Sequence, residues 1–494
     1  MSARVTFGPL DFIILGLFVA AILALGFSVR LRSNTILQFF AAGRTLTLPL
    51  FVASLVSLWY GGILGIGESV SFYGVGTWVL FGVPYYVFAI VYALWLAPRV
   101  RNAPQLSIPE RLHLRFGRNV AILGAVLLLL LAVPAAHVLM LGTLVKSFSG
   151  LSTTASIVVG TIIGVSFLYR GGLLADARAS LLAFLMMYVG FGVMVFWCLS
   201  HYPLVQTLST LPREKLKWDG GTGLIFVISM FIIGAWTLVD PGFHQRVSSS
   251  ANEKTGRTGV LISVGFWFLF DMLSITTALY AIALKTNGTG LDVLPAFAQQ
   301  TLPDGLKAVF FCGMLGTIVS AMVGYSLVSG TTIGREIIGR LKPSLNDSAL
   351  TQWSRVGIAI ACALAIILAR AINSVVDLWT AWAGAVVGAM LMPVLLAYRS
   401  GVNTRTSQAT ICVSMAAGFL VSIAWMIYGY THGNEQLMII LQRTADGYRL
   451  VVPGVATDQQ GLKIAVGTLL PGLLTSALVI ALGTALRRKG VEAA

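Results

Sequence analysis

The sequence predicts an all-α, polytopic membrane protein of about thirteen transmembrane helices, and three observations lead to this prediction. Of its 494 residues, 57% are hydrophobic and only 10% are charged, whereas soluble proteins carry about 25% charged residues. Apolar runs recur from residue 9 to residue 487. Most of these runs approach the roughly 20 residues that a helix needs to cross a bilayer. We therefore expect one membrane transport domain over residues 1–494, multi-pass in the plasma (inner) membrane, with the lipid bilayer as its solvent.

The individual spans follow from the apolar runs. The first run begins at Pro9 and has no small-residue cleavage site before Arg30, so we expect a retained helix and not a signal peptide. The expected spans are residues 9–28, 46–70, 75–97, 119–146, 153–169, 179–200, 222–240, 258–284, 306–330, 354–371, 374–397, 408–430 and 464–486.

The basic residues predict an orientation. Lys and Arg concentrate in cytoplasmic loops of membrane proteins. With the N-terminus outside and the C-terminus inside, 22 of the 33 basic residues fall in inward loops. This orientation needs an odd number of spans, which thirteen satisfies. The net charge of +15 is thus explained by topology, and we expect no nucleic-acid partner.

Two of the expected spans contain helix-breaking residues. Glycines crowd the second span between Gly61 and Gly67, and the seventh holds Gly234-Ala235-Trp236 followed by Asp240-Pro241-Gly242. Paired interruptions at corresponding places in two halves indicate a transporter site, although glycines also serve close helix packing. The two spans lie five apart. This spacing predicts a first repeat over 46–200 and a second over 222–397, with three extra helices, one at 9–28 and two within 408–486.

An interrupted helix leaves backbone carbonyls and amides free to hold an ion or a solute. We therefore expect a small polar solute to lie between the two interruptions. The candidate substrate-binding residues are Trp59, Gly61, Gly62, Glu68, Trp236 and Asp240. Asp271 is the deepest carboxylate in the predicted spans. It is either a proton-binding group or a neutral hydrogen-bonded one, and the sequence leaves both open.

No enzyme motif is present. The sequence lacks GxSxG, HExxH, a P-loop and paired acidic metal ligands, which are the usual signatures of hydrolases, metalloproteases and nucleotide-binding enzymes. We expect a protein that is not an enzyme and that uses no organic cofactor.

Five short motifs resemble the sodium:solute symporter family, in the family's order. They are Phe39–Leu46 (FFAAGRTL), Ser107–Leu112 followed by Arg115–Arg118, Tyr169–Leu173 (YRGGL), His244–Arg246 with Ser248–Ala251, and Ile318–Ser320 ahead of Arg335–Ile338. The resemblance implies a LeuT-like 5+5 inverted-repeat fold that works by alternating access.

The resemblance also implies a sodium site between the second and ninth spans. On this chain it would use carbonyls of Ser57, Tyr60 and Thr317 and the hydroxyl of Ser320, while the family's usual second hydroxyl falls on Ala321. The family's Thr-Asp pair, whose Asp can serve a second sodium ion, falls on Ala179-Ser180. We therefore expect sodium as the coupling ion and no second sodium by this route.

Three functions remain open from the sequence. The leading hypothesis is a cation-coupled symporter, most simply a sodium-coupled one, that imports a small polar solute. A proton-driven or uncoupled carrier on the same fold is the second, motivated by Ala321, Ser180 and Asp271. The third is a transporter-like membrane sensor that only binds its ligand.

Overall fold

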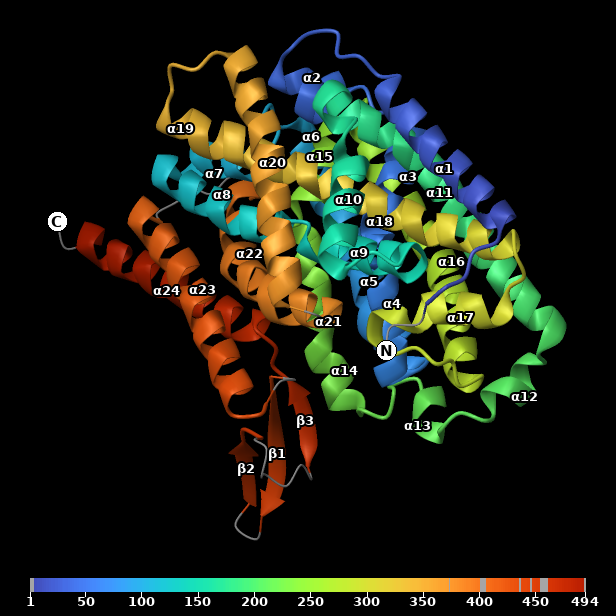
Figure 1. The fold of residues 1–494 in the computed structure, drawn as a ribbon. Coiled ribbons are helices and arrows are strands. Elements are labelled where there is room, and N and C mark those ends of the chain that lie inside the picture. Colours follow the sequence, from blue (N-terminus) through green and yellow to red (C-terminus); the bar gives the residue numbers. More distant parts are fainter. Residues whose placement is uncertain are drawn as a thin grey trace.

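The computed structural model describes residues 4–372, 374–399, 406–434, 437–444, 447–453 and 461–492. Within these ranges the protein is mostly helical (Figure 1). Ten helices are long and apolar enough to cross a bilayer, and an eleventh results if one bent pair is counted as a single span. Two shorter apolar helices, Thr153–Val165 and Gly384–Tyr398, lie where two further spans are predicted. The exact number of thirteen stays a prediction.

The first half of the bundle contains eleven α-helices and four short 3₁₀ or π-helical stretches, labelled η. They are α1 (Pro9–Phe27), α2 (Ile36–Ala41), η1 (Ala42–Arg44), α3 (Leu48–Trp59), η2 (Tyr60–Gly62), α4 (Ile63–Tyr73), η3 (Trp78–Gly82), α5 (Val83–Val91), η4 (Tyr92–Leu96), α6 (Ala97–Asn102), α7 (Ile108–Phe116), α8 (Arg118–Ala132), α9 (Ala135–Ser149), α10 (Thr153–Val165) and α11 (Leu168–His201).

The second half begins with two short connecting helices and continues through the remaining spans. Its elements are α12 (Leu204–Leu208), α13 (Arg213–Leu216), α14 (Leu224–Met230), η5 (Phe231–Leu238), α15 (Pro241–Ser249), α16 (Glu253–Ala283), η6 (Gly290–Asp292), α17 (Val293–Thr301), α18 (Leu306–Thr331), η7 (Thr332–Ile338), α19 (Gly339–Leu341), α20 (Asp347–Ala371), α21 (Val375–Asp377), η8 (Leu378–Ala383), α22 (Gly384–Tyr398), α23 (Gln408–Thr431) and α24 (Leu469–Glu492).

A small sheet corrects the all-α prediction. Strands β1 (Met438–Thr444), β2 (Gly447–Val451) and β3 (Leu462–Ala465) form an antiparallel sheet in the order β2-β1-β3. In its register, Leu441 pairs with Leu450 on one side and with Leu462 on the other. The sheet projects from one end of the helical bundle (Figure 1). The segment is too short and too polar to span a bilayer, so its backbone groups pair between strands, and the last helix begins at Leu469 and not at residue 464.

Helix α18 forms the centre of the core, because nearly all of its residues are buried. Its closest neighbour is α11. Their backbones approach at Gly190 and Gly313, where a Cβ on Gly313 would lie 2.9 Å from the carbonyl oxygen of Met186. Small residues permit such close helix packing in membranes. The core is therefore built around the helix that carries the predicted sodium ligands Thr317, Ser320 and Ala321.

The connecting elements separate onto two ends of the bundle (Figure 1). Helices α2, α6, α7, α15 and α19 gather at one end, and they carry many of the basic residues assigned to inward loops. Helices α12, α13 and α17, the three strands and the start of the described chain lie toward the other end. This arrangement agrees with the charge pattern, and the sidedness of the membrane stays a prediction.

Candidate functional site

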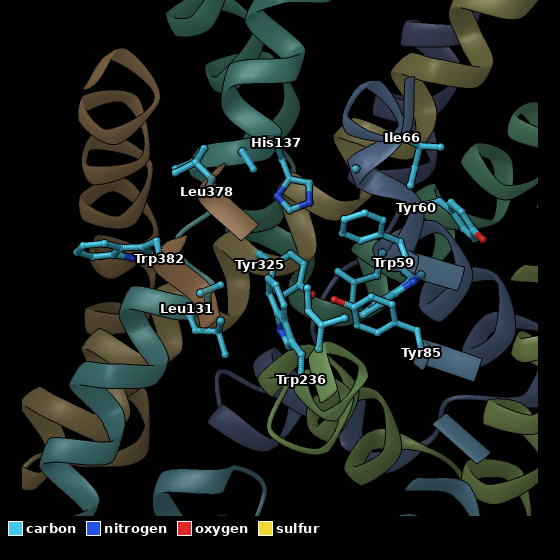
Figure 2. A pocket seen from close by; sticks show the side chains of 18 of the residues that line it. Trp59, Tyr60, Ile66, Tyr85, Leu131, His137, Trp236, Tyr325, Leu378 and Trp382 are labelled. Carbon is cyan, nitrogen blue, oxygen red and sulfur yellow. The ribbon is translucent and has the colours of Figure 1, made fainter. Parts of the chain in front are cut away.

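A cavity of about 130 Å³ lies inside the bundle. It has room for roughly four water molecules at about 30 Å³ each, or for a solute close to benzene in size, since a cavity of about 150 Å³ binds benzene. Trp59 and Tyr85 stand on one side and Leu131 and Trp382 on the opposite side, with Trp236 between them (Figure 2). Its walls come from α3, η2, η3, α4, α5, α8, α9, η5, α16, α18, α20 and η8, with Thr77, Val133 and Ile372 from the connections.

Two interrupted helices border this cavity, as the sequence predicts. The second span tightens into the 3₁₀ turn η2, where Tyr60 and Gly62 have ψ angles of 9° and 17° and leave the α-helical path without full unwinding. The seventh span has a longer 3₁₀ stretch, η5, and bends by 43° before α15. Irregular backbone at membrane depth is tolerated where it lines a cavity, and residues of both interruptions line this one.

Asp240 holds the bend of the seventh span in place. It is the N-cap of α15 and accepts a hydrogen bond from the Phe243 amide (2.8 Å), as Asp commonly does ahead of a Pro at the first helical position. Its other oxygen accepts from the Trp236 indole (3.2 Å) and the Tyr325 hydroxyl (2.9 Å). Asp240 is fully buried and is not in the cavity wall, whereas Trp236 and Tyr325 both are. It therefore positions two aromatic rings of the wall.

The other predicted substrate residues divide into two groups. Trp59 and Gly62 line the cavity together with Trp236. Gly61 instead faces α18 and α9. An added Cβ would collide with the methyl group of Ala321 on α18 and with the His137 ring on α9. Glu68 lies outside the wall and accepts a hydrogen bond from the Ser374 hydroxyl (3.0 Å).

Several wall residues are absent from the sequence-based site. Tyr85 packs edge-on against Trp59 with ring centroids 4.6 Å apart, and Tyr325 stacks on His137 at 5.4 Å. The Nδ1 atom of His137 is buried, with no hydrogen-bond partner among the described residues. Tyr86 and Trp382 also line the cavity. An excess of aromatic residues in the third span is the single sequence signal that could have pointed to this wall.

Asp271 contributes a carboxylate to the wall from the middle of α16. Its Oδ2 accepts a hydrogen bond from the Tyr86 hydroxyl. In the described part of the chain it forms no ion pair. One turn earlier, the Trp267 carbonyl accepts from the Tyr60 hydroxyl (2.8 Å), so Tyr60 directs its polar end toward α16.

Two of the predicted sodium ligands meet in a buried hydroxyl cluster, which we define as Ser57, Ser180 and Ser320. The Ser180 and Ser320 hydroxyl oxygens lie 2.7 Å apart, and Ser57 donates to the Ser180 carbonyl (3.3 Å). The cluster joins α3, α11 and α18. Thr317 instead donates its hydroxyl to the Met314 carbonyl within α18 (2.9 Å). Its backbone carbonyl, the predicted ligand, lies on the same helix.

A buried ion pair adjoins the hydroxyl cluster. Ser180 donates to Asp176 (3.3 Å), and the second oxygen of Asp176 pairs with Arg246 at 2.6 Å. Both charged side chains are at most 1% exposed. Arg246 also donates to Gln245 (2.6 Å), which in turn donates to the Phe40 carbonyl (2.9 Å). The carboxylate nearest to the cluster is thus already balanced by a fixed cation of the protein.

A second ion-pair network joins α7 to η7 at the end of the bundle that we predict to be cytoplasmic. Glu336 accepts from Arg335 (3.0 Å), Arg340 (2.6 Å) and the Ser107 hydroxyl (2.6 Å), and Glu110 pairs with Arg335 (2.8 Å). Ser107 is also the N-cap of α7. These contacts connect the loop after the third span to the end of the ninth.

Comparisons with known proteins agree on the class of protein. The chain is 24% identical to sodium/glucose cotransporter 4 of Danio rerio over 74% of its length, an alignment that spans 64% of that protein. It is 22% identical to the sodium/proline symporter of Haemophilus influenzae, over 83% of this chain and 86% of that one. Both relatives are transporters and not enzymes.

Solved structures show the same fold. A Na⁺-coupled sialic acid symporter in a substrate-bound outward-open state superposes with a TM-score of 0.78, at 12% identity, over 97% of this chain and 98% of that one. The nucleobase-cation-symport-1 family transporter Mhp1 superposes with a TM-score of 0.56, at 11% identity, over 93% and 96%. The protein thus has the LeuT-like transporter fold and is a multi-pass membrane protein. The family model that matches residues 39–405 shows that the chain belongs to the sodium:solute symporter family.

Proposed function

We propose that the protein is a sodium-coupled symporter that imports a small solute across the plasma membrane by alternating access. The observation that carries this proposal is a cavity bordered by two interrupted helices, with a buried hydroxyl cluster on α3, α11 and α18, of which α3 and α18 also line the cavity. Thirteen spans, an outside N-terminus, an inside C-terminus and two repeats over 46–200 and 222–397 belong to the same proposal.

We assign the sodium ion to the hydroxyl cluster. Sodium would take the Ser320 hydroxyl and the backbone carbonyls of Ser57, Tyr60 and Thr317, and Ser180 would give up its hydrogen bond to Ser320. Neutral oxygens suit this role because carbonyl groups at interrupted helices can coordinate sodium ions. Coupling follows if sodium binds more tightly to the outward-open state, because a ligand shifts a conformational equilibrium only through such a difference.

Direct sodium binding tests the assignment without knowledge of the solute. Purified protein is heated in NaCl or KCl at equal ionic strength, and unfolding is followed by tryptophan fluorescence. A bound ion at a concentration 100 times its Kd adds about 2.7 kcal/mol of stability, so sodium should raise the midpoint and Ser320→Ala should abolish the rise. Ser414→Ala, which removes a buried hydroxyl bonded within its own helix at Ile411 (2.8 Å), is the matched control and should keep it. Equal midpoints in the two salts would remove sodium from the proposal.

A proton-driven or uncoupled carrier is the second candidate, and two observations favour it. Ala321 packs against Gly61, so the place of the family's second hydroxyl is filled by a methyl group. Asp271 lies in the cavity wall without an ion-pair partner in the described ranges. Solute uptake into proteoliposomes driven by an inward proton gradient, in sodium-free potassium buffer, would support this candidate over sodium symport.

A further inference from the structure

The cavity wall holds one carboxyl group and no basic Lys or Arg side chain among the described residues. Its one carboxylate is Asp271, and neither Lys nor Arg lines it. A solute that carries a carboxylate or phosphate would meet this carboxylate without a basic side chain to balance its own charge. Burying an unpaired charge at membrane depth is costly, so the wall disfavours anionic solutes.

Asp271 lacks a protein cation but is held firmly. The Tyr86 hydroxyl donates to its Oδ2, and a Cβ on Gly82 would lie 2.8 Å from the same oxygen, so the backbone near the start of α5 packs against it. The side chain is only 4% exposed. The protein therefore fixes the carboxylate in position and leaves its charge to be balanced by something that enters the cavity.

The remaining wall is apolar and rich in aromatic rings. Trp59, Tyr85, Trp236 and Tyr325 come from α3, α5, η5 and α18, and Trp236 and Tyr325 lie between the side of Trp59 and Tyr85 and the opposite side of the cavity (Figure 2). Aromatic ring faces attract cations, ammonium groups in particular, and the attraction is strongest where water is excluded. They also pack against apolar groups. A carboxylate combined with several rings therefore fits a cation with an apolar body.

Resting on the transport function proposed above, we infer that the solute is a small organic cation, an amine or quaternary ammonium with an apolar body, whose charge is balanced by Asp271 and whose body packs against the aromatic wall. The cavity of about 130 Å³ limits the solute to a compact body, since a cavity of about 150 Å³ binds benzene.

Matched charged and uncharged probes test this inference on the unmodified protein. Choline is compared with its uncharged carbon analogue dimethylbutanol, and phenethylamine with phenethyl alcohol, by titration calorimetry in detergent with sodium present. Each cation should bind at least roughly tenfold more tightly than its neutral partner, because the neutral compound lacks the attraction to carboxylate and rings.

Variants then locate the charge. Asp271→Asn keeps the shape and removes the charge, so it should weaken binding of the cations by roughly tenfold or more and leave the neutral probes unchanged. Asp271→Glu should retain part of the affinity. Asp304→Asn is the control, since this carboxylate is exposed, lies outside the cavity and pairs with Lys307 (2.9 Å), and it should bind as the unmodified protein does.

Three results would overturn the inference: equal affinity for charged and neutral partners, unchanged cation affinity in a folded Asp271→Asn protein, or no binding of either cation at millimolar concentration. Measurements of solute uptake into proteoliposomes distinguish failure of the cation-site inference from failure of the proposed symport function. Cations that bind but are not accumulated by a sodium gradient contradict symport and leave the cation site standing. A neutral solute accumulated by sodium, with no competition from either cation, contradicts the cation site and leaves symport standing.

Discussion

Removal of the Arg246 guanidinium should strongly destabilise the folded protein. Arg246 and Asp176 form a pair at 2.6 Å, and both are at most 1% exposed. Arg246→Met keeps much of the side-chain volume and leaves Asp176 with the Ser180 hydroxyl as its one remaining partner among the described residues. Breaking a buried ion pair by removing one partner costs about 3–5 kcal/mol, because the other charge stays buried and uncompensated.

The double variant Arg246→Met/Asp176→Leu should lose less free energy of unfolding than the sum of the losses in the two single variants. Asp176→Leu alone strands the arginine charge, at a similar cost. With both changes no charge remains buried, and replacement of a whole buried pair by apolar residues is often neutral. We therefore expect the single losses to exceed the double loss by at least about 2 kcal/mol, a coupling well above the ~0.5 kcal/mol typical of independent sites.

Equilibrium unfolding in mixed detergent micelles, followed by tryptophan fluorescence, measures these free energies of unfolding. Arg370→Met is the control, because Arg370 is exposed near the end of α20 and such surface changes stay within about 0.5 kcal/mol. The reasoning is refuted if Arg246→Met is as stable as the control, or if the losses in the single variants simply add.

Three further predictions concern the transport path. Gly61→Ala should abolish uptake with normal expression, because the new methyl group collides with Ala321 and His137. Gly192→Ala is the control and should transport normally, because its new methyl group meets no atom within 4 Å. An active Gly61→Ala protein would contradict this packing. Tyr325→Phe should weaken solute binding roughly three- to tenfold by calorimetry, because Asp240, which also accepts from Trp236, loses the Tyr325 hydroxyl (2.9 Å) as a donor at a cost of ~0.7–1.4 kcal/mol; unchanged affinity would remove Asp240 from its positioning role. Glu336→Gln should lower the hydrogen-exchange protection of α7 by roughly tenfold, because Arg335 and Arg340 lose a carboxylate as their shared acceptor and only one uncharged amide oxygen remains; equal exchange in both proteins would show that the network does not hold α7.

The sequence predicts the helical framework because each span is a long apolar run. It also predicts both interruptions, since Gly61-Gly62 and Asp240-Pro241 are poor continuations of a helix. The wall residues Tyr85 and Tyr325 could not be assigned in this way. Lipid is as apolar as the protein interior, so a membrane helix does not reveal by hydrophobicity which of its faces lines a cavity.

Long-range pairing is the other part that the sequence does not reveal. The sequence shows Asp176 four residues before Ser180 and Arg246 in a family motif. Asp176 and Arg246 are 70 positions apart, and they meet because α11 and α15 both pack against α18. The sheet formed by β1, β2 and β3 could not be predicted either, because its strands are short and lie mostly between the expected spans 408–430 and 464–486. The roles of Ser57, Tyr60, Thr317, Ser320 and Ala321 in binding sodium stay predictions.

The hydrogen bond from the Ala465 amide to the Ser229 hydroxyl (2.8 Å) attaches β3 to α14, which leads into the bend of the seventh span. The sheet projects from the bundle (Figure 1) and is tied through this hydrogen bond to the helix before the bend. We therefore expect a nanobody bound to the strands to restrict movement at the bend, and so to inhibit transport without any molecule entering the solute cavity.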